Sequence, residues 1–401
     1  MRGPGTSARI PMQRQAELDW LRGLMLVLMT LTHVPTWFGA HLGQPFGFVS
    51  AAEGFVFLSA FLVGCVYSQM ARKRGFPAMR RAALGRAAKV YAAHVALLLF
   101  LFFVLVPFAT SHGAYAITDL ASFYVERPRV ALVAALALGY NPPLLDILPM
   151  YVLFIAASPR LIEVGSRRGW GPLLAVSAAL WLFAQLGGGQ HIYESIARLV
   201  EWPVPYAQTG AFSLLAWQLL WLVGLRAGTL KAEARLAAGS ERPWPRALVF
   251  GALSLAAVFF VMRHVTGQVP FATDAPLNAL FDKWHLGPLR LANFAVLAIL
   301  AVHWRDVLVA WAARSMIATL GRASLTVFTA HLVLCLGILA TAGEELAAHA
   351  SLEGAALVAG TLVTLYAVAR VMLAGERTVR VPLAVAAPRK VAAKIDPRMG
   401  S

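Results

Sequence analysis

Charged residues are scarce in this sequence: they make up 13% of its 401 residues, whereas 59% of the residues are hydrophobic. Soluble domains carry about 25% charged residues, which supply the polar side chains that cover their surface. A soluble alanine-rich helical enzyme is the alternative reading, and the repeated long uncharged stretches argue against it. The composition therefore predicts an all-α integral membrane protein in which membrane lipid covers the excess apolar surface.

Acidic residues and cysteines are also few. The 19 acidic residues are outnumbered by 35 basic ones, and the net charge is +16. The basic side chains gather in the connections between apolar segments, as they do in cytoplasmic loops of membrane proteins, so we expect no nucleic-acid partner. Cys65 and Cys335 both lie inside apolar segments, which argues against a disulfide framework.

Motifs for common cofactors are missing from the sequence. It contains no Walker loop, no zinc or haem motif and no dinucleotide fingerprint. These absences argue against an ATPase or a redox enzyme, and we expect no metal. The sequence carries no signal for an oligomeric state.

Apolar segments long enough to cross a bilayer recur along the chain, and we predict ten spanning helices with both termini cytoplasmic. Loops rich in Lys and Arg alternate with loops that have none, such as 39–48 and 342–351, as an even number of crossings requires. We divide the chain into a segment 1–16, one transmembrane domain 17–376 and a basic cytoplasmic tail 377–401, and we read 129–141 as an interfacial or re-entrant piece. The predicted spans are 18–38, 49–71, 90–110, 144–163, 171–187, 211–229, 247–264, 288–304, 316–341 and 352–373.

The first predicted span contains two polar residues, Arg22 and His33. Eleven residues are almost three helical turns, so both side chains share a face and are separated by roughly 16 Å along the axis. Intramembrane charges mark functional sites by default, and a histidine suits general-base work at neutral pH. The simpler alternatives are an interfacial anchor that pairs Arg22 with Asp19, and a His33 that only fixes helix packing.

Glu53, at the start of the second span, is expected at about the depth of His33. Such a carboxylate is able to orient and charge-balance an imidazole, so we predict a His33–Glu53 dyad. A purely structural Glu–His pair and an interfacial Glu53 that faces water are the alternatives.

Arg86 and Lys89 share a helix face at the cytoplasmic start of the third span and suit phosphate groups. Ordinary positive-inside charge explains much of this loop without a ligand. His94, two turns further on, is interpreted as structural.

Three further clusters are candidate substrate-binding residues. Two of them lie on the predicted outer side, where a Trp beside cations suits a carbohydrate but also fits an interfacial aromatic belt. The third is a mid-membrane His that lines the His33 cavity or bonds a neighbouring helix. Together with Asp19, these candidates are Asp146 and Tyr151, then Lys283, Trp284, His285 and Arg290, and finally His331.

Several of these features resemble the acyltransferase-3 superfamily and, more specifically, the OpgC family of glucan-modifying membrane proteins. An Arg followed after ten residues by a His, here Arg22 and His33, resembles the superfamily signature. The run from Glu53 to Leu62 resembles its "FFxLSGFL" stretch, with Ala60 in the place of the usual Gly. Arg86-Ala-Ala-Lys89 resembles an Arg-x-x-Arg motif with Lys in second place. The likeness extends over most of the chain.

The resemblance implies a bacterial inner-membrane enzyme that transfers an acyl group, typically succinyl from succinyl-CoA, to hydroxyls of an osmoregulated periplasmic glucan. It implies that His33 is essential, as general base or as acyl carrier, and that Arg22, Arg86 and Lys89 serve the acyl-CoA donor. A transporter or flippase for an anionic solute or glycan is the alternative, because intramembrane Arg and His also line substrate paths.

Overall fold

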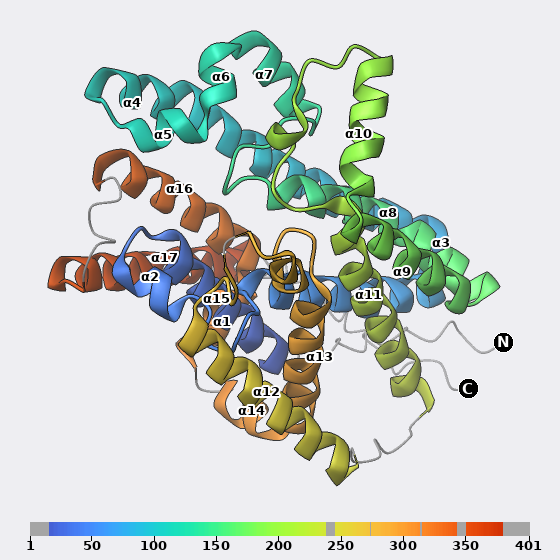
Figure 1. The fold of residues 1–401 in the computed structure, drawn as a ribbon. Helices are drawn as coiled ribbons and strands as arrows, with labels where there is room; N and C mark the ends of the chain where they lie inside the picture. The colour runs from blue at the N-terminus through green and yellow to red at the C-terminus, as the bar shows by residue number, and fades with distance from the viewer. Residues whose placement is uncertain (1–15, 238–244, 273, 313–314, 343–349, 380–401) are drawn as a thin grey trace, which may run out of the picture.

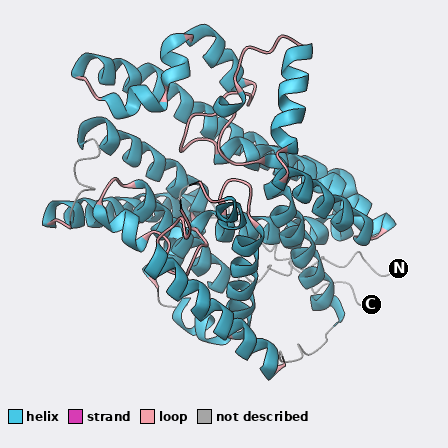
Figure 2. Cartoon of the chain, viewed as in Figure 1, coloured by secondary structure: helices cyan, strands magenta, loops and turns pink. Residues whose placement is uncertain are grey.

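The computed structural model describes residues 16–237, 245–272, 274–312, 315–342 and 350–379, and these residues form helices joined by loops (Figure 2). Five helical runs in this part of the chain are long and apolar enough to cross a membrane, or up to seven if two sharply bent helix pairs each count as one span. The all-helical membrane class is confirmed, whereas the total of ten spans and the sides of the termini stay predictions. The five runs are Ala51–His112, Ile147–Arg168, Arg246–Thr266, Ser324–Ala342 and Leu352–Gly375.

The predicted first span is a helix of 18 residues, α1 (Ala16–His33), followed by the short helix α2 (Trp37–Leu42). α1 stops two residues before Pro35, because proline disfavours helical geometry in the residue before it and has no N–H to donate. His33 is therefore the last residue of α1.

The second and third predicted spans lie in one long helical run, α3 (Ala51–Phe100). Gly75 interrupts it with φ 80° and ψ 165°, a conformation that side-chain-bearing residues rarely adopt, so α3 consists of two helices joined at a break. The second of them continues through a π-helical turn, η1 (Leu101–Leu105), into α4 (Val106–His112).

Three short helices follow α4 and lead into the next long one. They lie together along one edge of the fold in Figure 1. The last of them, α7, occupies most of the segment 129–141 that we interpreted as interfacial or re-entrant. The three are α5 (Tyr115–Leu120), α6 (Ser122–Glu126) and α7 (Pro128–Leu136), and the long helix is α8 (Ile147–Arg168).

Two of the predicted spans, 171–187 and 288–304, correspond to the first helix of a sharply bent pair. α9 (Gly171–Gln185) meets α10 (Gly188–Leu199) at 82°, and α13 (Pro288–His303) meets α14 (Arg305–Ala312) at 71°. The elements between them are η2 (Tyr206–Gln208), α11 (Leu214–Ala237), α12 (Arg246–Thr266) and η3 (Pro276–Phe281).

The predicted span 316–341 is not one helix. It consists of α15 (Met316–Arg322) and α16 (Ser324–Ala342), because Ala323 leaves helical geometry at φ −105° and ψ 30°. The break places Ser324 at the start of α16, and the last helix is α17 (Leu352–Val379).

Two helix crossings rest on small residues. Gly23 of α1 lies against the Ile317 carbonyl of α15, and Gly321 of α15 lies against the Asp19 carbonyl of α1, so neither position has room for a side chain. Such close approach of two backbones is how membrane helices gain packing energy. This crossing holds the Arg22 end of α1 against α15.

The second crossing joins α3 to α11. A Cβ atom added to Gly224 would lie 2.9 Å from the Ala60 Cβ, well inside van der Waals contact. Ala60 is fully buried, and it stands where the resemblance expected a glycine. The missing Cβ of Gly224 therefore leaves the space that the Ala60 methyl group occupies.

Candidate active site

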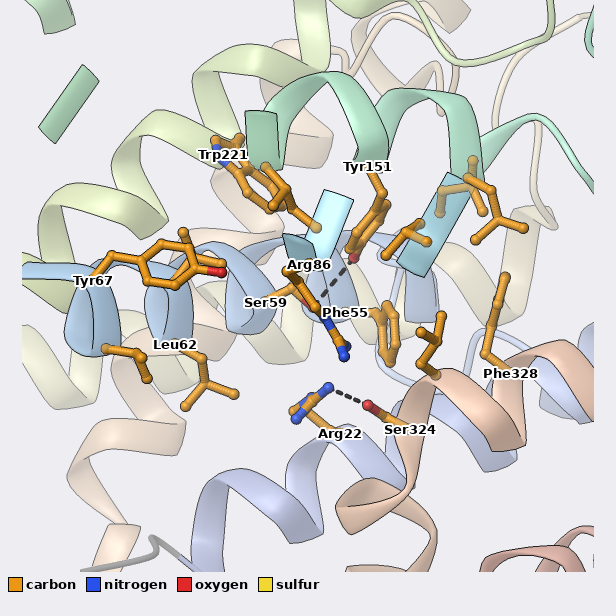
Figure 3. A pocket seen from close by; sticks show the side chains of 17 residues that line it. Arg22, Phe55, Ser59, Leu62, Tyr67, Arg86, Tyr151, Trp221, Ser324 and Phe328 are labelled. Atoms are coloured by element: carbon orange, nitrogen blue, oxygen red, sulfur yellow. Dashed lines mark hydrogen bonds between the residues drawn. The ribbon is translucent and has the colours of Figure 1, made fainter. Parts of the chain in front are cut away.

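A cavity of about 200 Å³ lies between α1, α3, α8, α11 and α16. Its walls are largely apolar, with a small number of polar side chains that point into it (Figure 3). The labelled lining residues are Arg22, Phe55, Ser59, Leu62, Tyr67, Arg86, Tyr151, Trp221, Ser324 and Phe328.

Arg22 and Arg86 bring two guanidinium groups to this cavity from different helices (Figure 3). Arg22 donates a hydrogen bond to the Ser324 hydroxyl, and its guanidinium lies 5.9 Å from the centre of the Phe55 ring. Lys89, which we expected beside Arg86, does not line the cavity, although both residues are exposed. The two cations of the Arg-x-x-Lys motif therefore have different surroundings.

Tyr151 lies in the same cavity and not beside Asp146, with which we had grouped it. Its hydroxyl donates to the Ser59 hydroxyl at 3.4 Å. Asp146, just before α8, accepts a hydrogen bond from the Ala211 backbone N–H at 3.0 Å. One and a half helical turns separate the two residues, which puts them on different sides of the start of α8.

A row of aromatic rings leads from the cavity toward His331. The Phe55 ring lies 5.9 Å from Tyr151 on one side and 6.0 Å from Phe328 on the other. Phe328 in turn lies 5.8 Å from the His331 ring. The rings form a wall between the two arginines and the histidine end of α1.

His33 of α1 and His331 of α16 form a direct pair. Their ring centres are 5.1 Å apart at an interplanar angle of 23°, and the His33 Nδ1 atom lies 3.3 Å from the His331 Nε2 atom. His331 is fully buried, whereas His33 is half-buried. Within the described residues the His33 Nε2 atom has no hydrogen-bond partner, so its lone pair or proton is available to a ligand.

Glu53 does not pair with His33, contrary to our prediction. Its carboxylate forms a buried ion pair with the Arg290 guanidinium of α13, and it also accepts from the Ser50 backbone N–H at 3.0 Å. The second contact belongs to a capping box, in which the Ser50 hydroxyl caps α3 in return. His331 therefore takes the place next to His33 that we had assigned to Glu53.

Lys283 and Trp284 lie on the loop that precedes α13. The Lys283 ammonium is 4.5 Å from the Trp284 ring centre and 5.8 Å from the Phe212 ring centre. Trp284 is 40% exposed. Its carbonyl oxygen accepts hydrogen bonds from the Trp217 indole N–H and from the Ser213 backbone N–H. The loop thus presents an aromatic face and a cation on a fixed backbone.

The Lys283 ammonium interacts electrostatically with the charges of Glu53, Asp146 and Arg290. Burial lowers the pKa of its ammonium, while the Glu53 and Asp146 carboxylates raise it and the Arg290 charge lowers it. The same ammonium lies within electrostatic range of His33. Glu53, Arg290, Asp146 and Lys283 therefore form a charged cluster on the His33 side of the fold.

His285 and Asp19 lie outside this cluster. The His285 Nδ1 atom is 2.6 Å from the Asp282 carboxylate, which also accepts from the Trp284 and His285 backbone N–H groups. Asp19 is buried at the crossing of α1 and α15, at the Arg22 end of α1. His285 thus has a local partner within its own loop, and Asp19 is far along α1 from His33.

Sequence reasoning missed Ser324, Phe328 and Asp282 as members of these sites. The first two join the site only because Ala323 breaks the helix and sets the rotation of α16. Asp282, by contrast, could have been predicted as a turn residue, because Asp side chains in turns accept from backbone N–H groups two residues on, as Asp282 does from Trp284.

The fold and the two sites define a helical membrane protein with a basic cavity and a direct pair of histidines. The family described as OpgC protein matches residues 14–376, nearly the whole chain, and the chain belongs to this family. Membership associates it with acyltransferase activity on osmoregulated periplasmic glucans. No curated protein and no solved structure matches the chain.

Proposed function

We propose that the protein moves a succinyl group from cytoplasmic succinyl-CoA to hydroxyl groups of a periplasmic glucan. The observation that carries this proposal is the state of His33. Its Nδ1 atom faces His331, its Nε2 atom has no partner among the described residues, and the ring is half-buried. An imidazole oriented through one nitrogen and available through the other is the arrangement that base-assisted acyl transfer uses.

The cavity beside Arg22 is the proposed donor site. Two guanidinium groups that face one cavity suit the phosphates or the free carboxylate of the donor, since Arg binds both with charge-assisted hydrogen bonds. Ligand pockets for drug-sized molecules measure about 300–1,000 Å³, so a cavity of about 200 Å³ holds only part of an acyl-CoA. The remainder would lie toward Arg86 and the exposed Lys89.

The proposed reaction uses the His33 Nε2 atom. It accepts the proton of the sugar hydroxyl while the sugar oxygen bonds to the thioester carbonyl carbon. The carbon–sulfur bond then breaks, and the departing thiolate takes the proton back from the imidazolium. A second route forms an acyl-histidine on the same nitrogen, with release of the thiol, before the sugar oxygen attacks.

The remaining charged residues support the acceptor side. The Trp284 ring offers a face for a sugar, and the Lys283 ammonium lies against that ring and acts electrostatically on His33. The Glu53–Arg290 pair is a positioning element, because it ties the start of α3 to the start of α13. The acceptor would thus enter over the loop that precedes α13.

The test uses the purified full chain with labelled succinyl-CoA and a glucan acceptor. We expect His33→Ala to abolish transfer while the protein reaches the membrane in normal amounts. His112→Ala, at the exposed end of α4, is the matched control and should keep full activity. Transfer by His33→Ala at the rate of the unmodified protein would refute the proposal, and movement of intact solute into vesicles would favour a transporter instead.

A further inference from the structure

Arg263, in the last turn of α12, is a buried arginine whose guanidinium has no counter-ion among the described residues. It is 8% exposed, its buried Nε atom has no acceptor, and no described residue forms a hydrogen bond or an ion pair with the guanidinium. Burying a guanidinium without a partner is expensive, because the charge loses its hydration and gains nothing in return. Something that the described residues do not supply must compensate this charge.

Two further buried donors nearby also lack partners. The Arg290 guanidinium bonds Glu53 and the Phe281 carbonyl, but one of its Nη atoms has no acceptor. The Asn293 side chain accepts from the Phe48 N–H at 2.8 Å, but its Nδ2 atom has no acceptor. Buried side-chain donors are nearly always satisfied, so three unsatisfied donors in one region require an explanation.

The fold brings these donors together. α12 and α13 pack against each other as consecutive helices, and Gly47 passes between Phe259 of α12 and Asn293 of α13 with no room for a side chain. Arg263 lies one turn beyond Phe259, and Arg290 lies one turn before Asn293. Because α12 and α13 run in opposite directions, Arg263 and Arg290 are both displaced toward the same end of the helix pair. The Arg290 charge acts on Arg263, as expected for near neighbours.

We propose that Arg263, Arg290 and Asn293 form a binding site for a phosphate group at the α12–α13 end of the fold. The Arg263 Nε atom, one Arg290 Nη atom and the Asn293 Nδ2 atom are donors without acceptors among the described residues, which suits an oxyanion. The Glu53 carboxylate bonds a different nitrogen of Arg290. Exposure falls from Arg263 at 8% to Arg290 at 4% and Asn293 at 0%, so the group enters past Arg263. This site is independent of the acyl-transfer proposal.

The surface around Arg263 indicates where such a phosphate comes from. Val261 and Val265 are 57% and 77% exposed on either side of it, and α12 buries only 17% of its most apolar stretch. Exposed apolar side chains on a membrane helix face lipid. A phospholipid headgroup therefore reaches Arg263 directly, and free inorganic phosphate offers the same chemistry from the water.

The test compares the unmodified protein with Arg263→Met, which keeps the length of the side chain and removes its charge. Unfolding midpoints are measured with increasing inorganic phosphate at constant ionic strength, and in nanodiscs of phosphatidylglycerol or of phosphatidylcholine. Stabilisation by a ligand grows with the logarithm of its concentration above Kd. We expect the unmodified protein to be stabilised by phosphate or phosphatidylglycerol, and the apparent Kd to weaken at least tenfold in Arg263→Met.

Without phosphate the order of stability should reverse, and Arg263→Met should unfold at a higher temperature than the unmodified protein, because an uncompensated buried charge has been removed. Arg246→Met, at the exposed start of α12, is the control and should respond to phosphate as the unmodified protein does. A response to phosphatidylglycerol alone assigns the site to lipid, and a response to inorganic phosphate assigns it to the free anion. No response to either probe, or an equal response in Arg263→Met, overturns the proposal. If the variant does not fold, native mass spectrometry of the unmodified protein decides the question by whether phosphate or phosphatidylglycerol stays bound.

Discussion

The His33 Nδ1 atom lies 3.3 Å from the His331 Nε2 atom, across 298 residues of sequence. One ring must donate the hydrogen bond and the other accept it, so His331 determines which nitrogen of His33 carries the proton. We expect His331→Ala to reduce the rate of acyl transfer by about 10²–10⁴-fold, the range that general-base assistance contributes. The measurement is the dependence of kcat on pH, which a merely structural loss would leave unchanged in shape.

His94→Phe is the control for this prediction. His94 is fully buried in α3, and both of its ring nitrogens lack partners. We interpreted it as structural, and a Phe of similar shape should leave the pH profile of kcat as it is. A changed profile in His94→Phe, or an unchanged rate in His331→Ala, would contradict the assignment of the histidine pair.

The two cations of the Arg86-Ala-Ala-Lys89 motif should differ in effect. Both residues are exposed, but only Arg86 lines the cavity. A hydrogen bond to a charged group contributes about 1.5–3 kcal/mol, so Arg86→Gln should raise KM for the acyl-CoA by roughly tenfold or more. Lys89→Gln should change KM less than about twofold, as exposed charge pairs do. Equal effects on KM would count against the cavity as the donor site.

The buried Glu53–Arg290 pair predicts a strong coupling between two substitutions. Removing one partner of a buried ion pair destabilises a protein by about 3–5 kcal/mol, because the other charge stays buried and unpaired. We expect Glu53→Gln and Arg290→Met each to lower the unfolding midpoint strongly, and the double variant to recover much of the loss. Additive losses in the double variant would show that the two charges do not act on each other.

The space between Ala60 and Gly224 gives a packing test. Extra methyl groups in a well-packed core cost about 1–3 kcal/mol, so Gly224→Ala should lower the free energy of unfolding by that amount. Ala60→Gly should restore part of it, because the Ala60 Cβ is the side-chain atom nearest to the added methyl group. Thermal unfolding of the single and double variants measures both values, and no rescue would mean that the Phe57 carbonyl of α3 alone sets the limit.

The His285–Asp282 pair predicts a pH dependence of stability. The hydrogen bond with Asp282 raises the pKa of His285 above 6.5 against the opposing effect of burial. For Asp282, burial raises the pKa, but the hydrogen bonds from His285 and the backbone outweigh it and lower the pKa below 3.8. The protonated His285 therefore stabilises the fold fully below pH 6.5, and this contribution is lost as the pH rises through its folded pKa.

We expect the difference in unfolding midpoint between the unmodified protein and His285→Asn to shrink as the pH rises from 6 to 9. The Asp282 contribution is present above pH 3.8 and is lost as the pH falls below that value, so it does not interfere in this range. A difference that stays constant over this range would show that the pair carries no pH-dependent free energy.

The parts of the site that depend on local helical periodicity could be predicted from the sequence. The eleven-residue spacing put Arg22 and His33 on one face of α1 because the helical repeat is fixed. The break at Ala323 was not predicted, and with it the contact of Ser324 with Arg22 was missed. His331 was expected either to line the His33 cavity or to bond a neighbouring helix, and it lies beside His33. The partner of Glu53 lies 237 residues away in Arg290, a choice that only tertiary packing makes.

The capping box of Glu53, unlike its ion pair, could have been predicted from the sequence. Ser50, three residues before Glu53 at a helix start, is a sequence-level sign that the carboxylate turns back toward its own helix. We predicted the pairing with His33 instead, but in the structure the Glu53 carboxylate forms the local hydrogen bond with Ser50. The ten predicted spans followed from composition alone, which marks apolar segments but not the bends of 82° and 71° at the ends of two of them.

Helices α1 and α16 touch through two polar contacts, Arg22 with Ser324 and His33 with His331. The contacts are eleven residues apart on α1 but only seven apart on α16, and at 1.5 Å per residue that difference is about 6 Å, a distance the long Arg22 side chain spans. The two contacts therefore fix the position of α16 along α1 at two separate points. Any sliding of α16 along α1 would loosen both together, so occupancy of the arginine cavity and alignment of the histidine rings are mechanically coupled.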